Sequence, residues 1–139
     1  MSFTPYIFFD GNCSDAIDFY AEVFGADNVI KMPYADAPPD VGLPPSPDRF
    51  MHAQIDVGST TLMCSDNPEG MPSQPQSGFA VAHETQTLDE AKDKFAKLSD
   101  GGEVTMPFEP TFFSEGFGML KDKFGTSWMV MVAGEPPAN

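Results

Sequence analysis

The stretch GFGMLKDKFGTSWMVMV, residues Gly116–Val132, decides the fold that this sequence predicts. Two runs of strand-forming residues, Gly116–Leu120 and Ser127–Val132, flank a connector at Lys121–Thr126. The connector carries an aspartate and a glycine at turn positions, as β-hairpin loops commonly do. We therefore expect a β-hairpin with a loop of about four to six residues.

Both faces of the second strand in this hairpin are apolar, because successive side chains of a strand point to opposite faces. One face carries Trp128, Val130 and Val132. The other carries Met129 and Met131. A strand of this kind either lies centrally in a covered sheet or lines a pocket with one face, and an ordinary core hairpin is the simpler interpretation.

The rest of the chain repeats one order of elements: strand, helix and three strands. The first copy is predicted at Phe3–Phe9, about Ser14–Phe24, Asp27–Met32, Phe50–Val57 and Thr60–Cys64. The second copy is predicted at Gly78–Ala82, Thr87–Leu98, Glu103–Pro107 and the two strands of the hairpin. We therefore expect an α+β fold in which two β-α-β-β-β modules, at about residues 1–66 and 78–134, make a single domain of residues 1–139.

Both predicted helices carry local start or stop signals. Gly25 stands just past the first helix, where a left-handed glycine commonly ends a helix. Thr87, with Glu90 three residues later, forms a capping box at the start of the second helix. Between the second and third strands of the first module, the proline-rich residues 33–47 predict a long irregular loop.

The chain is strongly acidic: seven Lys and Arg against 21 Asp and Glu give a formal net charge of −14. Phosphate backbones and anionic lipid surfaces repel such a chain, so we expect no nucleic-acid partner and no membrane partner. No apolar run reaches the roughly 18 residues of a membrane span, and the N-terminus lacks an export signal. We therefore expect a cytoplasmic protein in which Cys13 and Cys64, which have no paired-thiol spacing, are reduced and buried.

Several local strings occur in the order typical of one known family. They are Pro5–Asn12, Ala16–Gly25, Met51–Ala53, Leu62–Asp66, Leu98–Pro107 and Phe117–Met129. Through them the chain resembles the PhnB-like branch of the vicinal oxygen chelate superfamily, also described as 3-demethylubiquinone-9 3-methyltransferase-like, which has the glyoxalase and bleomycin-resistance fold. A Trp-Gly pair is common in the last loop of that branch, where this chain has Phe113 and Ser114.

The resemblance implies a cup-shaped mixed sheet, half of it from each module, and a homodimer. Members of this superfamily bind a small molecule inside the cup, often through a divalent metal ion. The enzymes chelate two neighbouring oxygens of the substrate on the ion and so stabilise an enolate or alkoxide. Other members only sequester a drug.

The resemblance also places the usual metal ligands, two or three His or Glu side chains, on the first and last strands of each module. Met129 stands at the glutamate position, and Pro5 or its neighbour replaces the first histidine. Thioethers and imino acids do not bind hard or borderline cations such as Mg²⁺, Mn²⁺ or Zn²⁺. Only Ser65 or Asp66 could supply an oxygen, so we expect no metal at this position and no cofactor.

The candidate ligand-binding residues are a histidine, two methionines and three aromatic residues. They are His52, Met63, Phe113, Phe117, Trp128 and Met129. Thioethers and aromatic rings form a soft, polarisable lining for a flat apolar ligand. Core packing would explain many of the same side chains, so we expect no more than half of the aromatic and methionine residues to reach a cavity.

The chain has two histidines, His52 and His83. His52 matches a position where the branch often keeps histidine, and an ordinary pKa of about 6.5 suits a proton shuttle or a hydrogen-bond donor facing the cup. It could equally be a strand histidine that is satisfied by a backbone carbonyl or that lies at a dimer seam. His83, at the end of a predicted strand beside Glu84, is expected at the surface.

Two functions are consistent with these observations. The first is a homodimeric cytoplasmic protein that binds a small organic ligand in the cup without a metal ion. The second is a metal-dependent isomerase, lyase or dioxygenase-like enzyme with a displaced site built from His52, Asp66 or Glu115. Methyl transfer gains no support, because no cofactor-binding glycine loop follows the first strand.

Overall fold

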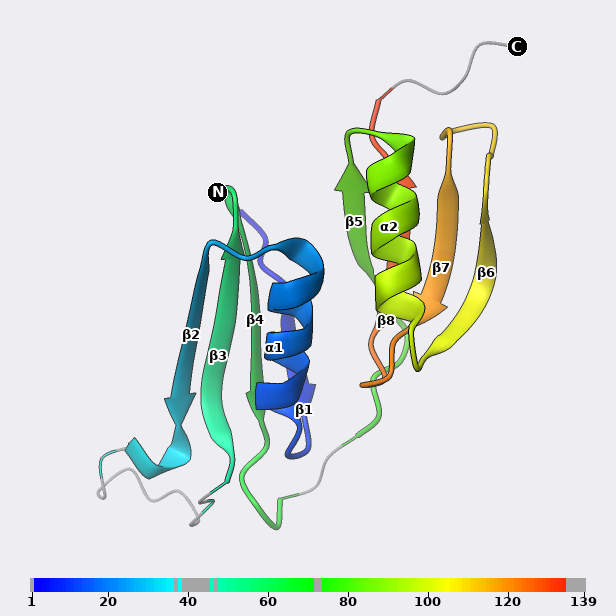
Figure 1. Cartoon of the computed structure of the whole chain (residues 1–139). Coiled ribbons are helices and arrows are strands. Elements are labelled where there is room, and N and C mark those ends of the chain that lie inside the picture. Colours follow the sequence, from blue (N-terminus) through cyan, green and yellow to red (C-terminus); the bar gives the residue numbers. More distant parts are fainter. Residues whose placement is uncertain (1, 37, 39–45, 47, 72–73, 135–139) are drawn as a thin grey trace. The chain divides into compact units, whose positions relative to one another are not determined.

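The computed structural model describes residues 2–36, 38, 46, 48–71 and 74–134 of the 139-residue chain. The proline-rich loop predicted at residues 33–47 lies largely outside these ranges. The chain divides into two compact units, Met1–Gln74 and Pro75–Asn139, each built around its own four-stranded sheet (Figure 1). The single domain and the cup concern how the two units sit together, and both stay predictions.

Within the described residues, the first unit combines four strands with one α-helix. The elements are β1 (Tyr6–Phe9), α1 (Cys13–Phe24), β2 (Asn28–Pro33), the 3-10 turn η1 (Tyr34–Asp36), β3 (Phe50–Val57) and β4 (Thr60–Asp66). The strand order is β1-β4-β3-β2, with β1 parallel to β4 and the other neighbours antiparallel. The helix α1 lies over one face of this sheet (Figure 1).

The second unit repeats this plan. Its elements are β5 (Val81–Thr85), α2 (Leu88–Ser99), β6 (Glu103–Glu109), β7 (Phe117–Lys121) and β8 (Ser127–Val132). The strand order is β5-β8-β7-β6, β5 is parallel to β8, and α2 lies over one face (Figure 1). The α+β class and the two β-α-β-β-β modules are therefore confirmed, and each sheet is open, with two edge strands.

The first strand of the second module begins later than predicted, because β5 spans Val81–Thr85 rather than Gly78–Ala82. Gly78 has a φ of +77°, a left-handed conformation that lies outside the extended region. The register partner of Val81 is Trp128, the second residue of β8. The strand β5 therefore starts at the first residue that pairs with β8.

The helices begin and end where their local signals predict. Gly25 has a φ of 65° and ends α1 in the left-handed conformation. The Thr87 side chain accepts the backbone N–H of Glu90 at 3.2 Å and so caps α2. Each helix has 12 residues. Within the described parts of the chain, neither these helices nor any other is long and apolar enough to cross a membrane.

The strand β8 divides its side chains between two faces as predicted. Trp128, Val130 and Val132 are buried on the side of α2. Met129 and Met131 are half-buried on the other side. The core of the second unit therefore lies between α2 and one face of its sheet.

A glycine on β7 lets α2 approach the sheet closely. A Cβ atom at Gly118 would lie 2.6 Å from a ring carbon of Phe95 on α2, closer than such atoms pack. Glycine at this position therefore leaves room for the aromatic ring of the helix. Because strand side chains alternate, Phe117 and Met119, on either side of Gly118, point to the opposite face.

A buried carboxylate in the first unit binds backbone N–H groups at the start of α1. Asp66, at the end of β4, is 1% exposed. Its Oδ1 accepts the backbone N–H groups of Gly11 and Cys13, each at 2.9 Å, and its Oδ2 accepts that of Phe50 at 3.0 Å. The N-cap residue Asn12 makes no capping side-chain hydrogen bond. Asp66 therefore satisfies the positive end of α1 from a distant part of the sequence.

A second buried carboxylate holds the turn between β7 and β8. The Oδ1 atom of Asp122 accepts the backbone N–H groups of Phe124 and Thr126 at 2.9 and 3.0 Å. Its Oδ2 accepts the indole N–H of Trp128 at 2.8 Å. The polar atom of a core tryptophan is thereby satisfied by the turn itself, so the turn and the core are fixed together.

Replacing Asp66 with alanine is expected to lower the free energy of unfolding by roughly 2–4 kcal/mol, because buried backbone N–H groups lose a charged acceptor. Equilibrium unfolding in urea would measure the change. Asp48→Ala, at an exposed position, is the control and is expected to lie within about 0.5 kcal/mol of the original protein. An Asp66→Ala variant as stable as this control would contradict the capping role.

Candidate functional site

Each sheet has one face under its own helix and a second face that this helix does not cover, which we call the open face. In the first unit, alternate positions of all four strands point to the open face. These residues include Tyr6 and Phe8 on β1, Ile30 and Met32 on β2, His52 and Gln54 on β3, and Met63 on β4. The residues between them, such as Ile7, Ala53 and Cys64, are buried. Tyr6 is 39% exposed and Phe8 is 60% exposed, so aromatic rings remain accessible on this face.

His52 is the centre of a hydrogen-bonded row on the open face. Its Nδ1 lies 3.0 Å from the hydroxyl oxygen of Tyr6, and its Nε2 lies 2.9 Å from Oε1 of Gln54. An amide oxygen only accepts, so the row is consistent when Nε2 carries the proton and Nδ1 accepts from the phenol. The rings of Tyr6 and His52 are also in contact, with 5.7 Å between their centroids. Side chains of the same face, and not a backbone carbonyl, therefore satisfy His52.

The open face of the second unit is rich in methionine. Met129 lies opposite Met119, and Met119 lies opposite Met106, so thioethers from β8, β7 and β6 are neighbours. In the next row, Met131 lies opposite Phe117. Paired residues of antiparallel strands have Cβ atoms about 4.5–5.5 Å apart. These side chains therefore form one continuous surface of sulfur, methylene groups and aromatic carbon.

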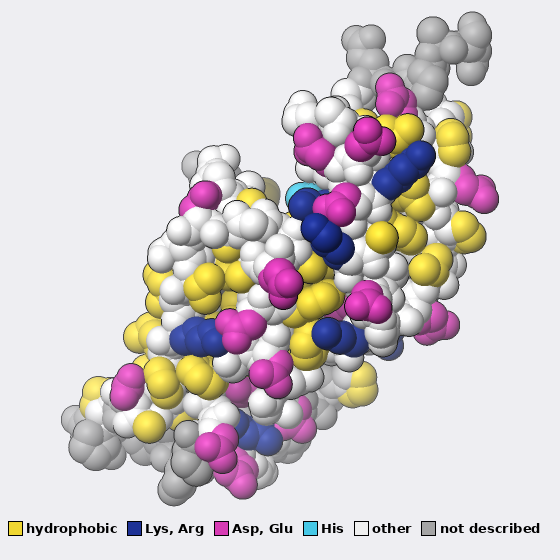
Figure 2. Space-filling view, viewed as in Figure 1, with side chains coloured by type: hydrophobic (Ala, Val, Ile, Leu, Met, Phe, Trp, Pro, Cys, Tyr) yellow, Lys and Arg dark blue, Asp and Glu magenta, His cyan; other side chains and the backbone are white. Residues whose placement is uncertain are grey.

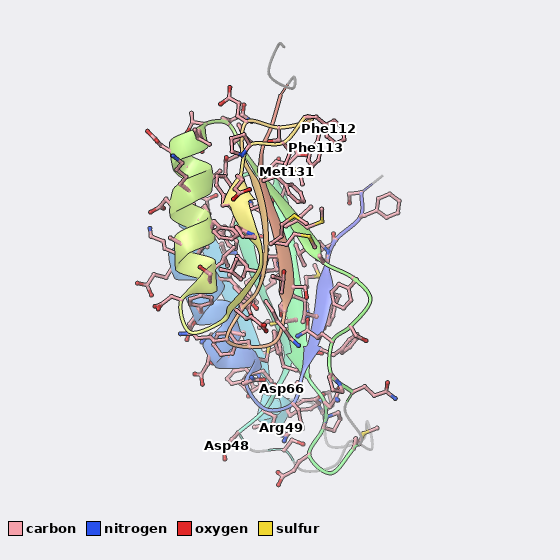
Figure 3. The ribbon with its side chains drawn as sticks, turned by 90° about the vertical axis from the view of Figure 1, so that its right-hand side faces the viewer. Asp48, Arg49, Asp66, Phe112, Phe113 and Met131 are labelled. Carbon is pink, nitrogen blue, oxygen red and sulfur yellow. The ribbon has the colours of Figure 1, made fainter. Side chains whose placement is uncertain are left out.

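The loop before β7 adds two phenylalanines to this surface. Phe113 packs edge-on against Phe117 with 5.1 Å between ring centroids, and Phe112 packs against Phe113 at the same distance. Figure 3 shows Phe112 and Phe113 near Met131. The loop is ordered by Thr111, whose Oγ1 accepts two backbone N–H groups at 3.1 and 3.3 Å. A structured turn therefore presents these two rings, and Phe112 is 88% exposed.

Most of the predicted ligand-binding residues lie on an open face or beside one. They are His52 and Met63 in the first unit, and Phe113, Phe117 and Met129 in the second. Trp128 is different, because it is 2% exposed on the helix side and its indole N–H is bound by Asp122. Trp128 therefore belongs to the core of the second unit and supports the hairpin turn, and it does not lie on the open face.

Other residues of the open faces were not among the candidate ligand-binding residues named from the sequence. They include Tyr6, Gln54, Met106 and Met131. Strand alternation could have found Gln54, which follows His52 by two positions, and it did place Met131 on the same face as Met129. Tyr6 depends on the parallel pairing of β1 with β4, which no local pattern contains.

Among the described residues, the paired positions on the first and last strands of each module offer no ligand set for a hard or borderline cation. Tyr6 is paired with Met63 between β1 and β4, and Ala82 is paired with Met129 between β5 and β8. Neutral phenol, thioether and methyl groups are not ligands of Mg²⁺, Mn²⁺ or Zn²⁺. Across the residues that the structure describes, no three or more His, Cys, Asp and Glu side chains are grouped so that they could hold a metal ion.

The displaced metal site considered above was built from His52, Asp66 or Glu115. The carboxylate of Asp66 is not available to a metal ion, because it is already bound within the protein. Both oxygens of Asp66 accept backbone N–H groups, at the end of the first sheet where Figure 3 also labels Arg49. Both ring nitrogens of His52 have side-chain partners within its own face. Asp66 is therefore a structural residue rather than a free metal ligand.

Two buried cysteines lie next to each other in the core of the first unit. The Sγ atoms of Cys13 and Cys64 are 2.9 Å apart, and both thiols are free and fully buried. The hydrogen bond with Cys64, together with burial, raises the pKa of the Cys13 thiol far above its ordinary value. The buried free thiols predicted from the sequence are confirmed, and Cys13 is a poor nucleophile.

His83 lies on the helix side of its sheet and is half-buried, so the expected surface position is wrong. It is the register partner of Val130, which belongs to the core. Burial lowers the pKa of His83, and Lys94 lowers it further, while Glu90 acts in the opposite direction. The expectation failed because β5 begins later than predicted, which places His83 in the middle of the strand.

Comparisons with known proteins show that this chain is similar to one family over nearly its whole length. The family model for 3-demethylubiquinone-9 3-methyltransferase matches residues 1–131. Protein YjdN of Escherichia coli (strain K12) is 33% identical over 147 residues, which cover 99% of this chain and 99% of that protein. The crystal structure of protein PA1353 from Pseudomonas aeruginosa is 36% identical, with a TM-score of 0.86 over 95% of this chain and 97% of that one.

More distant solved structures share the fold. A PhnB protein from Bacillus cereus is 26% identical, with a TM-score of 0.73 over 96% of this chain and 100% of that one. A glyoxylase/bleomycin resistance protein/dioxygenase domain from Frankia sp. EAN1pec is 9% identical, with a TM-score of 0.67 over 96% of this chain and 98% of that one. At that level of identity the likeness shows the fold alone.

We expect His83 to make the protein less stable as the pH falls below about 6.5. Its pKa is lower in the folded chain than in the unfolded chain, so the unfolded chain takes up the proton first. This contribution to stability is complete above the unfolded pKa and is lost as the pH falls through the folded pKa. His83→Gln should therefore flatten the unfolding free energy between about pH 7.5 and 5.5 more than His52→Gln does. Equal slopes in the two variants would contradict this account.

Proposed function

The chain belongs to the 3-demethylubiquinone-9 3-methyltransferase family, and we propose that it works as a small-molecule-binding protein. The PhnB-like resemblance and the glyoxalase/bleomycin-resistance fold are both confirmed. In this proposal the ligand lies against the open face of a sheet, without a metal ion at the position where the family resemblance implies one. The thioether and aromatic lining of the second unit's open face carries the proposal.

The lining suits a flat and largely apolar ligand. Sulfur atoms of methionine make favourable contacts with aromatic rings, worth about 0.3–1.5 kcal/mol each. The paired residues Met106, Met119 and Met129 offer several such contacts to one ring system. Phe113 and Phe117 add aromatic edges at the end of this row. Flexible thioethers also adjust to ligands of different outline, so the proposal favours a family of related shapes.

A ligand that binds on the first unit's open face would meet polar groups there that can orient it. The phenol of Tyr6 donates to His52, and its oxygen keeps lone pairs that can accept a hydrogen bond. Gln54 Nε2 makes only a long contact of 3.5 Å, to Asp56, so the amide retains donor capacity. A few polar groups on an otherwise apolar surface are typical of small-molecule sites.

Methyl transfer is not part of the proposal, although the family description names it. Asp10, Gly11 and Asn12 follow β1, and they do not form the glycine-rich loop that cradles a nucleotide-like cofactor. Metal-ion catalysis is not included either, because Met63, Ala82 and Met129 supply no oxygen or imidazole donor on the strands concerned.

We also propose that the protein acts as a homodimer in the cytoplasm. The edge strands β2 and β6 carry apolar side chains that are between 39% and 46% exposed: Val29, Ile30, Met32, Val104 and Met106. Apolar residues on edge strands favour pairing with another chain. The free buried thiols fit a reducing compartment.

A catalytic role for His52 is the second candidate, and the hydrogen-bonded row from Tyr6 to Gln54 favours it. In that role the imidazole would receive the phenol proton of Tyr6 while the phenolate takes a proton from the ligand. Tyr6→Phe separates the two candidates. An enzyme of this kind would lose nearly all turnover in the variant, whereas a binding protein would keep most of its affinity.

Replacing Met129 with lysine is expected to weaken the binding of Nile red, a flat neutral dye, at least tenfold, because it puts an ammonium group into the thioether row. Fluorescence titration would give the dissociation constants. Met71→Lys is the matched control, because it makes the same charge change at a residue outside both sheets that is 50% exposed. Chelation with EDTA should leave binding unchanged. Equal affinities in the two variants, or loss of binding on chelation, would overturn the proposal.

A further inference from the structure

Two carboxylates stand at the ends of one row on the second unit's open face. Glu84 on β5 is the register partner of Met131. Met131 is the partner of Phe117, which in turn is the partner of Glu109 on β6. Among the described residues, neither glutamate has a hydrogen-bond or ion-pair partner. The row therefore carries an acid, a thioether, an aromatic ring and a second acid across four strands.

The basic side chains of the second unit lie away from the middle of this face. They belong to α2 or to the turn end of β7: Lys92, Lys94, Lys97, Lys121 and Lys123. Lys94 and Lys97 pair with Asp93 on the same helix, at 3.4 and 3.1 Å. Figure 2 shows basic and acidic side chains intermingled around α2. The negative charges of the row on the open face have no such compensation.

The first unit has the same asymmetry of charge. Lys31 pairs with Asp18 of α1 at 2.8 Å, and Arg49 pairs with Asp10 at 2.6 Å beside the turn that follows β1. On the open face of this unit the described residues include Asp56 but no lysine or arginine. Both units therefore keep their strongly basic groups off the middle of the open face, in a chain with a net charge of −14.

We propose that the open face of the second unit selects flat organic cations, aromatic compounds that carry a protonated amine or a quaternary nitrogen. This inference rests on the proposed function and names the ligand class for the same surface. The ring of the ligand would lie on the thioethers and beside Phe113, which is 41% exposed and packs against the buried Phe117, and a cation also gains from an electron-rich aromatic face. Its nitrogen would lie toward Glu84 or Glu109, since both are exposed and within the same row. A carboxylate or phosphate ligand would meet like charges there and no basic partner.

Three naphthalene probes of matched size test the charge preference. They are 1-naphthylmethylamine, which is a cation at neutral pH, the neutral 1-naphthalenemethanol and the anionic 1-naphthoate. Calorimetric titration would measure their affinities. The titration is done at about 150 mM salt, because salt screens the general attraction of an acidic protein for cations. We expect the cation to bind about three- to tenfold more tightly than the neutral probe, and the anion to bind more weakly than either.

The variant Glu84→Gln with Glu109→Gln should remove most of the preference for the cation while leaving the affinity of the neutral probe unchanged. Asp89→Asn with Asp100→Asn, at the two ends of α2, makes the same change in net charge and should keep the preference. Equal binding of all three probes would overturn the charge selection but leave the proposed function standing. Loss of preference in both double variants would assign it to net charge and overturn the inference. Failure of every probe to bind would overturn both proposals.

Discussion

A single helix can cover only one face of a four-stranded sheet, and this constraint shapes both units. The helices α1 and α2 bury one face each, and the core of each unit lies there. When one face of a sheet meets water, the side chains on that face are usually polar. Here the second face keeps rings and thioethers, such as Phe8 in the first unit and Met119 in the second. Apolar residues that do not serve the core of their own unit mark an interaction surface, and the proposed function assigns a small molecule to it.

Buried carboxylates fix the strands that carry this lining. Asp66 follows Met63 by three residues and ties the end of β4 to α1 and β3. Asp122 holds the turn into β8 and binds Trp128, the neighbour of Met129. In each case a charged acceptor satisfies several N–H groups at once, which makes the arrangement stiff and costly to disturb. The lining residues on β4 and β8 therefore project from strands whose ends are held by buried carboxylates, which is the kind of support that a preorganised site needs.

Features set by neighbours in the sequence could be predicted, and those set by distant residues could not. Alternation along β8 gave the correct faces, and Gly25 and Thr87 ended and began their helices as expected. The same local reasoning could not find that Asp66, 53 residues away from Cys13, caps α1. It also missed the contact of Cys13 with Cys64, which depends on how α1 packs over β4, and the row from Tyr6 to Gln54, which depends on the parallel pairing of β1 with β4. Trp128 was assigned to the ligand because an aromatic residue on a strand apolar on both faces gives no sign of which face the helix will cover.

The replacement of hard donors by thioethers changes what this surface can recognise. Met129 stands where the resemblance implies a glutamate ligand, and in the first module Met63 lies on the open face as the register partner of Tyr6. A metal ion would hold a substrate through two oxygens and would tolerate little variation in their geometry. Thioethers and rings hold a ligand through contact area and dispersion instead, which fixes its size and flatness but hardly its orientation. In the proposed function, orientation and charge preference come from the few polar groups on each open face, which are His52 in the first unit and Glu84 and Glu109 in the second.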